Sequence, residues 1–554
     1  APDWFASNRF GAGVVFEPFT LVWTRADGVY CEHRLNRTKP MNGAESMLQT
    51  LLNAGVEVCF ANPGTSEMHM VSAIGKDQSM RSVLGLFEGV CSGAADGYAR
   101  IAGKPALTLL HLGPGLSNAS ANLHNAKKAF SPVINLIGDH ATYHKKYDAP
   151  LNSDIEGLSG PISHWYQTVP TASDLPQAAA EAAQVARTAP GQISTLIIPA
   201  DCAWDESVAP VAALPVPARA SVDDESIKTA AEWLKGGKTT YLLMSNQALC
   251  EEGLALASQV SNATGARILC DTFTPLVARG EGRCDIERLG YFAEQATVQL
   301  EAAEQLILVG TKAPVGFFAY PGKASEFYPE GCSLHQLATV EEDSLEALSR
   351  LVDALNATAV EPERIQLAKP GLVTGEFGPE AIAAAVGHFL PTNAIVVDES
   401  ATSGAFLGPM TRASEPHDWI SLTGGSIGYG LPVSIGASVA DGDRKVVCLH
   451  GDGGAMYTIQ SLWTMVRENL DVCVVIFANR KYQILQVELS RVGAQSMDPN
   501  TLKMLDLGNP ELDFVKIAEG MGLEATRADT AKAFNDQFAS AMQNRGPRLI
   551  EAWF

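Results

Sequence analysis

The chain has 554 residues, which is too long for a single hydrophobic core and indicates about three domains. Hydrophobic residues make up 46% and charged residues 18%, as in ordinary globular proteins, and no apolar run is long enough for a transmembrane helix. The net charge of −22 argues against nucleic acid or an anionic membrane as the main partner. The ten cysteines are scattered and form no CxxC pair, so we expect reduced thiols and a cytoplasmic protein.

The first forty residues differ from the rest of the chain. They are rich in aromatic residues and arginine but lack the apolar core and cleavage site of a signal peptide. From Met41 onward, Ala44, Met47 and Leu48 recur on one face of a helical pattern. We therefore expect the main fold to begin at Met41, and residues 1–40 to be an N-terminal extension of unknown role.

Short apolar strands alternate with helical segments along most of the chain, which is typical of doubly wound parallel sheets. A proline-containing linker near residues 208–219 and a second linker near 357–371 interrupt this alternation. The sequence thus predicts an α/β fold of three consecutive doubly wound parallel-sheet domains, at residues 41–207, 220–356 and 374–554. In the middle one we expect strands near Tyr241–Met244, Arg267–Cys270, Leu306–Val309 and Ser333–Leu337.

A βαβ unit near the C-terminus carries the clearest chemical signal. The apolar run from Val446 to Leu449 leads into Gly451-Asp452-Gly453-Gly454, and a second apolar run ends before Asn479. Because ligands bind at the carboxyl ends of strands in such sheets, the side-chain oxygens of Asp452 and Asn479 should converge on one crevice. Oxygen ligands without Cys or His suit Mg²⁺, and the glycines would let a diphosphate approach the backbone.

Glu88 opens the segment LFEGVCSGAADGYAR, directly after an apolar strand. A carboxylate in the first turn of a helix is favoured by the helix dipole, so its position alone does not indicate catalysis. The whole segment, together with the distant GDG and Asn pattern, resembles the thiamine-diphosphate-dependent decarboxylases and synthases. The resemblance covers roughly residues 41–554 and is weakest in the middle of the chain.

The resemblance assigns roles to particular residues. It names the three domains pyrimidine-binding, central and diphosphate-binding, and it makes Glu88 the partner of N1′ on the cofactor's pyrimidine. The Mg²⁺ ligands would be Asp452, Asn479 and the backbone carbonyl of Lys481. The remaining residues expected to contact the cofactor are Ala401, Thr402, Gly425, Ile427, Gly451, Gly453, Gly454 and Tyr482.

Within the family, the benzoylformate decarboxylases are the most similar subfamily and the acetolactate synthases come next. Thr65, in Asn-Pro-Gly-Thr, retains the hydroxyl that contacts the substrate carboxylate in the decarboxylases, and His111 falls on their first catalytic His. Their second catalytic His has no counterpart in VGFFAYPG, and Glu488 stands where they have an aromatic residue. His140 and His144 are alternative proton donors.

The resemblance therefore implies Mg²⁺- and thiamine-diphosphate-dependent, non-oxidative decarboxylation of a 2-oxo acid, giving an aldehyde or a carboligated product. The alternatives are an acetolactate-synthase-type carboligase and, less favoured, a catalytically silent homologue. FAD accompanies many carboligases, but the middle of the chain shows no dinucleotide fingerprint, so FAD is not expected. We expect a homodimer or homotetramer, whereas the identity of the 2-oxo acid stays open.

Overall fold

The computed structural model describes residues 22–26, 29–33, 41–494 and 498–554. Ala1–Met41 and Asn42–Phe554 form separate compact units. In the first unit, β1 (Val22–Ala26) pairs with β2 (Val29–His33) in an antiparallel hairpin. Most of the extension expected at residues 1–40 lies outside the described residues.

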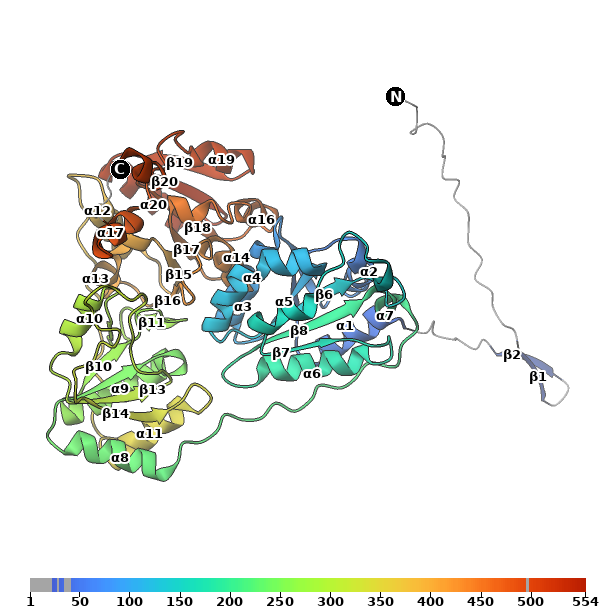
Figure 1. Ribbon diagram of the computed structural model, residues 1–554, viewed down its shortest axis with the longest axis horizontal. Helices are drawn as coiled ribbons and strands as arrows, with labels where there is room; N and C mark the ends of the chain where they lie inside the picture. The colour runs from blue at the N-terminus through green and yellow to red at the C-terminus, as the bar shows by residue number, and fades with distance from the viewer. Residues whose placement is uncertain (1–21, 27–28, 34–40, 495–497) are drawn as a thin grey trace. The chain divides into compact units, whose positions relative to one another are not determined.

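The second unit contains three sheets formed by successive parts of the chain (Figure 1). The first sheet has six parallel strands in the order β4-β3-β5-β6-β8-β7. Its strands are β3 (Val58–Asn62), β4 (Arg81–Leu84), β5 (Ala106–His111), β6 (Val133–Asp139), β7 (Trp165–Thr168) and β8 (Ile193–Pro199). Its helices are α1 (Gly43–Asn53), η1 (Thr65–Glu67), α2 (Met68–Lys76), α3 (Glu88–Ala102), α4 (Leu112–Lys128), η2 (Lys145–Tyr147), α5 (Ile155–Ile162), α6 (Leu175–Arg187) and α7 (Ala200–Trp204).

The central sheet has five strands in the order β12-β10-β9-β13-β14, again parallel. Its strands are β9 (Thr240–Met244), β10 (Arg267–Cys270), β12 (Glu287–Arg288), β13 (Gln305–Val309) and β14 (Ser333–Ala338). Its helices are α8 (Asp224–Lys235), η3 (Asn246–Leu249), α9 (Glu251–Thr264), α10 (Ala293–Leu300) and α11 (Ser344–Ala354). The four strands expected here from sequence are confirmed.

The third sheet has seven strands in the order β11-β16-β15-β17-β18-β20-β19. Its strands are β11 (Val277–Arg279), β15 (Ala394–Glu399), β16 (His417–Ser421), β17 (Val446–Gly451), β18 (Val472–Ala478), β19 (Glu524–Ala528) and β20 (Arg548–Trp553). Its helices are α12 (Pro379–Phe389), η4 (Ala401–Gly404), α13 (Leu407–Thr411), α14 (Gly430–Ala440), α15 (Asp452–Ala455), α16 (Ser461–Arg467), α17 (Gln483–Arg491), α18 (Pro499–Lys503), α19 (Phe514–Gly520) and α20 (Ala531–Gln543).

The third sheet also shows a connection that the sequence did not suggest. β11 comes from the central part of the chain, yet it pairs antiparallel with β16 as an edge strand, while the other strands run parallel. The α/β class with parallel sheets is confirmed, and this short strand ties the central part of the chain to the third sheet.

The first helix illustrates how local sequence sets an element boundary. The Asn42 side chain accepts a hydrogen bond from the backbone of Glu45 at 2.9 Å, and the Glu45 carboxylate accepts one from the Asn42 backbone at 3.2 Å. This capping box fixes the start of α1. The apolar face expected from sequence is buried at Ala44, Met47 and Leu48, so α1 packs against the first sheet.

Helices cover both faces of each sheet. On the first sheet, α1, α2, α6 and α7 lie on one face, and α3 and α4 on the other. α12 and α20 cover one face of the third sheet, while α14 and α16 cover the opposite face. The apolar side chains under α14 and α16 belong to the same buried cluster as those under α3 and α4. The first and third sheets therefore share one apolar core.

Close helix packing makes this shared core. α3 crosses α14 so tightly that a Cβ built on Gly97 would lie 2.1 Å from the carbonyl oxygen of Val433. A Cβ on Gly436 would lie 1.8 Å from the carbonyl oxygen of Ala94. Glycine is therefore required at both positions, and the two sheets are brought together beside the start of α3. Among the described helices, none has the length and apolar character needed to cross a membrane.

Candidate active site

Topology places the predicted residues at two switch points. In the first sheet, β3 has β4 on one side and β5 on the other; in the third sheet, β15 lies between β16 and β17. At such points the connections leave in opposite directions and open a crevice at the carboxyl ends of the strands. Thr65, Glu88 and His111 follow or end β3, β4 and β5, whereas Asp452 and Asn479 follow β17 and β18.

The predicted metal ligands follow β17 and β18, two neighbouring strands of the third sheet. Asp452 is buried, and its Oδ2 accepts the backbone N–H of Arg480 at 2.6 Å, between Asn479 and Lys481. Asn479 Oδ1 accepts the backbone N–H of Lys481 at 3.1 Å. The structure therefore brings together the segments that follow the two consecutive strands of this βαβ unit.

The chemistry of this donor set fits a divalent cation. Burial raises the pKa of Asp452, and backbone N–H groups of Arg480 and Gly453 oppose that rise. In the described part of the chain, no cationic side chain forms an ion pair with this carboxylate. The positive charge of Arg480 also opposes the rise in the pKa of Asp452. A metal ion would add a directly bound counter-charge, and a single carboxylate with neutral oxygens suits Mg²⁺.

A glycine-lined surface adjoins Asp452. A Cβ on Gly453 would lie 2.3 Å from the ring of Tyr482, so the ring rests directly on the backbone of the GDG turn. Gly451 and Gly454 are partly exposed on either side. Such a surface lets a diphosphate approach backbone N–H groups without steric conflict.

Ala401 and Thr402 lie in η4, at the carboxyl end of β15 and next to β17. Ala401 has φ +51°, a left-handed conformation that is uncommon for alanine. α17, which begins after Tyr482, packs against η4. The residues expected to contact a diphosphate therefore lie at the carboxyl ends of three neighbouring strands, β15, β17 and β18.

Gly425 and Ile427 lie in the loop between β16 and α14. Ile427 is 37% exposed, an unusual state for isoleucine and one that leaves its side chain available to a ligand. Phe317, from the VGFFAYPG segment, lies against this loop, because a Cβ on Gly425 would be 2.4 Å from its ring. The VGFFAYPG segment, which has no counterpart of the decarboxylases' second catalytic His, therefore places an aromatic ring against this loop.

A buried acid that sequence reasoning missed supports the same loop. Glu399 ends β15 and accepts the backbone N–H groups of Gly428 at 2.5 Å and of Gly430 at 2.7 Å. His450 Nε2 lies 2.9 Å from the second carboxylate oxygen, without the alignment of a hydrogen bond. Burial lowers the pKa of His450, but the nearby Glu399 carboxylate outweighs it and the net shift is upward.

In the first sheet, Glu88 is the first residue of α3, and it is 8% exposed. Its Oε2 accepts a hydrogen bond from Asn118 Nδ2 at 2.9 Å. A Cβ on Gly115 would lie 3.2 Å from Glu88 Oε1 and 3.5 Å from the Cβ of His111. Both predicted catalytic residues therefore border Gly115, where a side chain would meet the carboxylate of Glu88.

His111 is oriented by a second acid that the sequence analysis did not single out. Its Nδ1 lies 2.8 Å from Glu67 Oε2, and Glu67 has no exposed surface. The same carboxylate accepts the backbone N–H of Gly64 at 2.7 Å and the hydroxyl of Ser66 at 2.9 Å. Thr65 is exposed at the start of this turn. An acid two residues after Thr65 was the available sequence signal, because acids in such turns often cap the backbone.

One helix of the first sheet contacts both the start of α3 and the loop before α14. Asn122 Nδ2 donates to the carbonyl oxygen of Gly89 at 2.9 Å and lies 3.5 Å from that of Gly428. Asn125 and Ser426 exchange two hydrogen bonds, at 2.8 and 3.2 Å. α4 thus links the start of α3, where Glu88 lies, to the loop that carries Ile427.

The alternative proton donors lie apart from this arrangement. The rings of His140 and His144 are 5.5 Å apart, centroid to centroid, beyond the end of β6. Within the described residues, neither forms a hydrogen bond or ion pair with His111 or Glu88. Glu488 lies in α17, near Arg491 and Tyr320. The pKa of Tyr320 is raised mainly by burial and further by Glu488.

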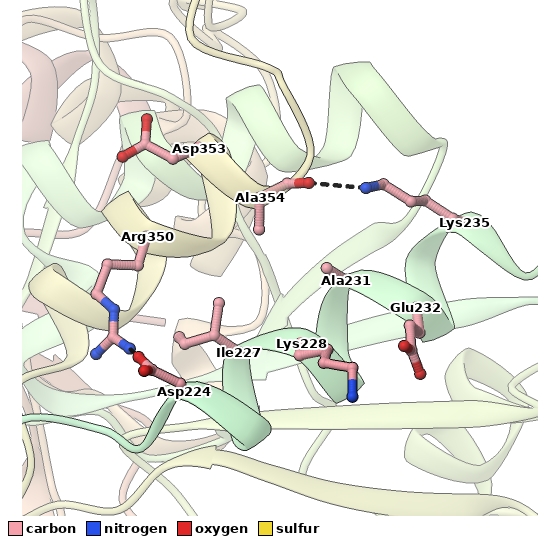
Figure 2. A pocket seen from close by; sticks show the side chains of 9 residues that line it. All are labelled: Asp224, Ile227, Lys228, Ala231, Glu232, Lys235, Arg350, Asp353 and Ala354. Carbon is pink, nitrogen blue, oxygen red and sulfur yellow. Dashed lines mark hydrogen bonds and ion pairs between the residues drawn. The ribbon is translucent and has the colours of Figure 1, made fainter.

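A separate cavity of about 510 Å³ lies between α8 and α11, far from these motifs in the sequence (Figure 2). Arg350 forms an ion pair with Asp224 there, and Lys235 donates to the carbonyl oxygen of Ala354 at 2.7 Å. None of its lining residues comes from either crevice. We therefore place the candidate active site at the crevices and not here.

Comparisons with known proteins agree with this geometry. The model of the N-terminal TPP binding domain of thiamine pyrophosphate enzymes matches residues 41–167, and that of their C-terminal TPP binding domain matches residues 401–552. Thiamine pyrophosphate is another name for thiamine diphosphate. The first match contains Glu88 and His111, and the second contains Ile427, Asp452 and Asn479.

Individual relatives cover nearly the whole chain. A Mycobacterium tuberculosis protein with the provisional name acetolactate synthase large subunit IlvX is 49% identical over 92% of this chain and 98% of its own. A benzoylformate decarboxylase from Pseudomonas aeruginosa is 27% identical over 91% of this chain and 97% of its own. The solved thiamine-diphosphate-dependent 4-hydroxybenzoylformate decarboxylase of Rhodococcus jostii RHA1 superposes with a TM-score of 0.79, at 25% identity, over 93% of this chain and 99% of its own. The chain belongs to the thiamine pyrophosphate enzyme family, whose members include decarboxylases and acetolactate synthases.

Proposed function

We propose that this protein binds thiamine diphosphate together with Mg²⁺ and decarboxylates a 2-oxo acid without oxidation, releasing an aldehyde or passing the product to a second carbonyl compound. The main support is that Glu88 and His111 both border Gly115, in a chain where the segments of Asp452 and Asn479 are joined by a hydrogen bond from the backbone of Arg480. Each pair alone has a structural explanation. The occurrence of both pairs at switch points of two parallel sheets in one chain is what favours catalysis.

The third-sheet residues would hold the cofactor. Asp452, Asn479 and the carbonyl of Lys481 would bind Mg²⁺, and the metal would neutralise a diphosphate resting on Gly453 and Gly454. Ala401 has no side-chain donor, so it could contribute only its backbone, whereas Thr402 offers a hydroxyl. When bound, thiamine diphosphate supplies an electron sink that lets the bond to the substrate carboxylate break.

The first-sheet residues would control protons. Glu88 would hold a proton at the pyrimidine nitrogen, with Asn118 fixing one of its carboxylate oxygens. Glu67 would hold His111 by Nδ1 and leave Nε2 to exchange a proton with the substrate oxygen. Thr65 would place its exposed hydroxyl against the substrate carboxylate, while Ile427 and Phe317 would exclude water from the loop side.

An acetolactate-synthase-type carboligase is the second candidate, because the 49% identical relative carries that name. It predicts a reaction that consumes two carbonyl substrates, whereas simple decarboxylation consumes one. We do not expect FAD. A catalytically silent homologue is less favoured, because Glu88, Asp452 and Asn479 are all retained.

We further propose that the protein is at least a homodimer, or a homotetramer. Leu86, Met456 and Tyr457 are 46%, 38% and 55% exposed, and they flank Glu88 and the GDG turn. Exposed apolar side chains beside polar motifs commonly mark an interface. In the family pattern, the Glu-bearing part of one copy faces the GDG-bearing part of another, so the crevices would become enclosed on assembly.

The direct test is to titrate the purified protein with thiamine diphosphate and Mg²⁺ by calorimetry, and then to screen 2-oxo acids for CO₂ release. Product analysis separates the candidates: an aldehyde indicates a decarboxylase, and a hydroxyketone or acetohydroxy acid indicates a carboligase. Tight cofactor binding without CO₂ release from any 2-oxo acid would favour the silent homologue. No binding of the cofactor would overturn the proposal.

A further inference from the structure

Glu399 occupies an unusual place between two elements of the candidate site. It ends β15, is 6% exposed, and accepts backbone N–H groups from the end of the loop after β16 and from the first residue of α14. One oxygen accepts from Gly428 and the other from Gly430. The two bonds lie on either side of Tyr429, two residues after Ile427, so this single side chain fixes the backbone where the loop enters α14.

The same side chain also touches the GDG turn. A Cβ on Gly454 would lie 2.8 Å from Glu399 Oε1, and a Cβ on Gly430 would lie 2.8 Å from the ring of His450. His450 directly precedes Gly451 and has no exposed surface, and its Nε2 lies 2.9 Å from Glu399 Oε2. Glu399 is therefore packed between the loop that carries Ile427 and the turn that carries Asp452.

We infer that Glu399 is a positioning residue that sets where Ile427 stands relative to the GDG turn; this inference rests on the proposed function. At the length of a glutamate side chain, one carboxylate oxygen meets the N–H of Gly428 and the other meets the N–H of Gly430. A carboxylate held further back on a shorter side chain would not keep both hydrogen bonds. When the Glu399 side chain is shortened or loses its charge, we expect the loop that carries Ile427 to become more mobile, while the diphosphate site stays intact.

Two substitutions separate reach from charge. Glu399→Gln keeps the length but has only one acceptor oxygen, so its amide group faces a backbone N–H. Glu399→Asp keeps the charge but is too short to reach both Gly428 and Gly430. A matched control is Glu551→Gln, which removes the charge of another fully buried glutamate of the third sheet, far along the chain from the loop.

The first measurement needs no cofactor. Hydrogen exchange followed by mass spectrometry on the apoprotein should show at least about tenfold faster exchange in peptides spanning residues 422–431 for both Glu399 variants, and parental exchange there for Glu551→Gln. Parental exchange in Glu399→Asp would show that charge, and not reach, is what matters, and would overturn the inference. The aspartate variant keeps the negative charge, so it remains informative if the glutamine variant does not fold.

The second measurement uses the cofactor. Both Glu399 variants should bind thiamine diphosphate and Mg²⁺ within about threefold of the parent, yet exchange the proton at cofactor C2 at least about tenfold more slowly, because a misplaced loop misaligns the bound ring. Equal losses in affinity and exchange would indicate a general structural role and contradict the inference. Failure of the parent itself to bind the cofactor would overturn the proposed function, while the apoprotein result would still decide whether Glu399 holds the loop.

Discussion

The imidazole Nδ1 of His111 lies 2.8 Å from a carboxylate oxygen of Glu67, a residue with no exposed surface. Because a carboxylate only accepts hydrogen bonds, the proton on the neutral ring must sit on Nδ1. Nε2 is then the nitrogen left to exchange protons. Since the ring is partly exposed, the pair resembles an oriented general acid or base more than a buried structural contact.

Glu67→Gln should therefore disturb the ring of His111 more than the fold. We expect turnover to fall by at least about tenfold, since loss of an orienting carboxylate lets the imidazole adopt the wrong tautomer. Nitrogen NMR of labelled histidine should show a single tautomer in the parent and a mixture in the variant. Glu551→Gln, another buried glutamate, serves as the control, and unchanged turnover with an unchanged tautomer in Glu67→Gln would refute the orienting role.

Cofactor binding should require Mg²⁺. Removal of metal with EDTA, or the substitution Asp452→Ala, should weaken thiamine diphosphate binding by at least about 10²-fold, because the buried crevice then lacks the charge that balances the diphosphate. Calorimetry measures this directly. Asp443→Ala, an exposed acid before β17, should bind as the parent does. Equal affinity with and without EDTA would show that the metal assignment is wrong.

The protein should sediment as a dimer or larger assembly. Leu86 and Tyr457 are exposed apolar side chains next to the two motifs, and association would remove them from water. Analytical ultracentrifugation at the concentration used for assays tests this. A fully active monomer would contradict the expectation.

Much of the fold and the site follows from local sequence. The GDG turn and Asn479 could be placed together because both follow apolar β-branched runs, and parallel strands end at one edge. Glu67 and Glu399 could not be found this way. Each is an ordinary acid in the sequence, and its role appears only when residues distant in the chain, His111 for Glu67 and Gly428 and Gly430 for Glu399, come within hydrogen-bond reach. The pairing of β11 with β16 is likewise long-range. β11 has only three residues, which is too few for a hydrophobic pattern to predict a strand.

Mild acid should destabilise the protein partly through His417. Burial lowers the pKa of this histidine from 6.5 to about 3, and Arg279 adds to the effect. Between these values the unfolded chain takes up a proton that the folded protein does not, so stability present above the unfolded pKa is lost as pH falls toward the folded pKa. At about pH 5 the loss from this group is about 2 kcal/mol.

His417→Gln cannot take up this proton, so its melting temperature should fall less than that of the parent between about pH 7.5 and about pH 5. The variant will start from a lower stability, because the bond from Nδ1 to the carbonyl oxygen of Glu415, at 2.7 Å, is altered. The informative quantity is therefore the difference between the two pH values. An equal drop in both proteins would show that His417 does not contribute to acid sensitivity.

The central claim is that Glu88 activates a thiamine cofactor bound at the GDG turn. Glu88→Gln should bind thiamine diphosphate and Mg²⁺ as the parent does, because those contacts come from the third sheet, yet an amide cannot hold and release the proton as an acid. The decisive measurement is proton exchange at C2 of the bound cofactor, followed by NMR in D₂O. We predict exchange at least about 10²-fold slower in Glu88→Gln than in the parent. Equally fast exchange in both would mean that Glu88 is only a carboxylate at the start of α3, and it would contradict the proposed mechanism.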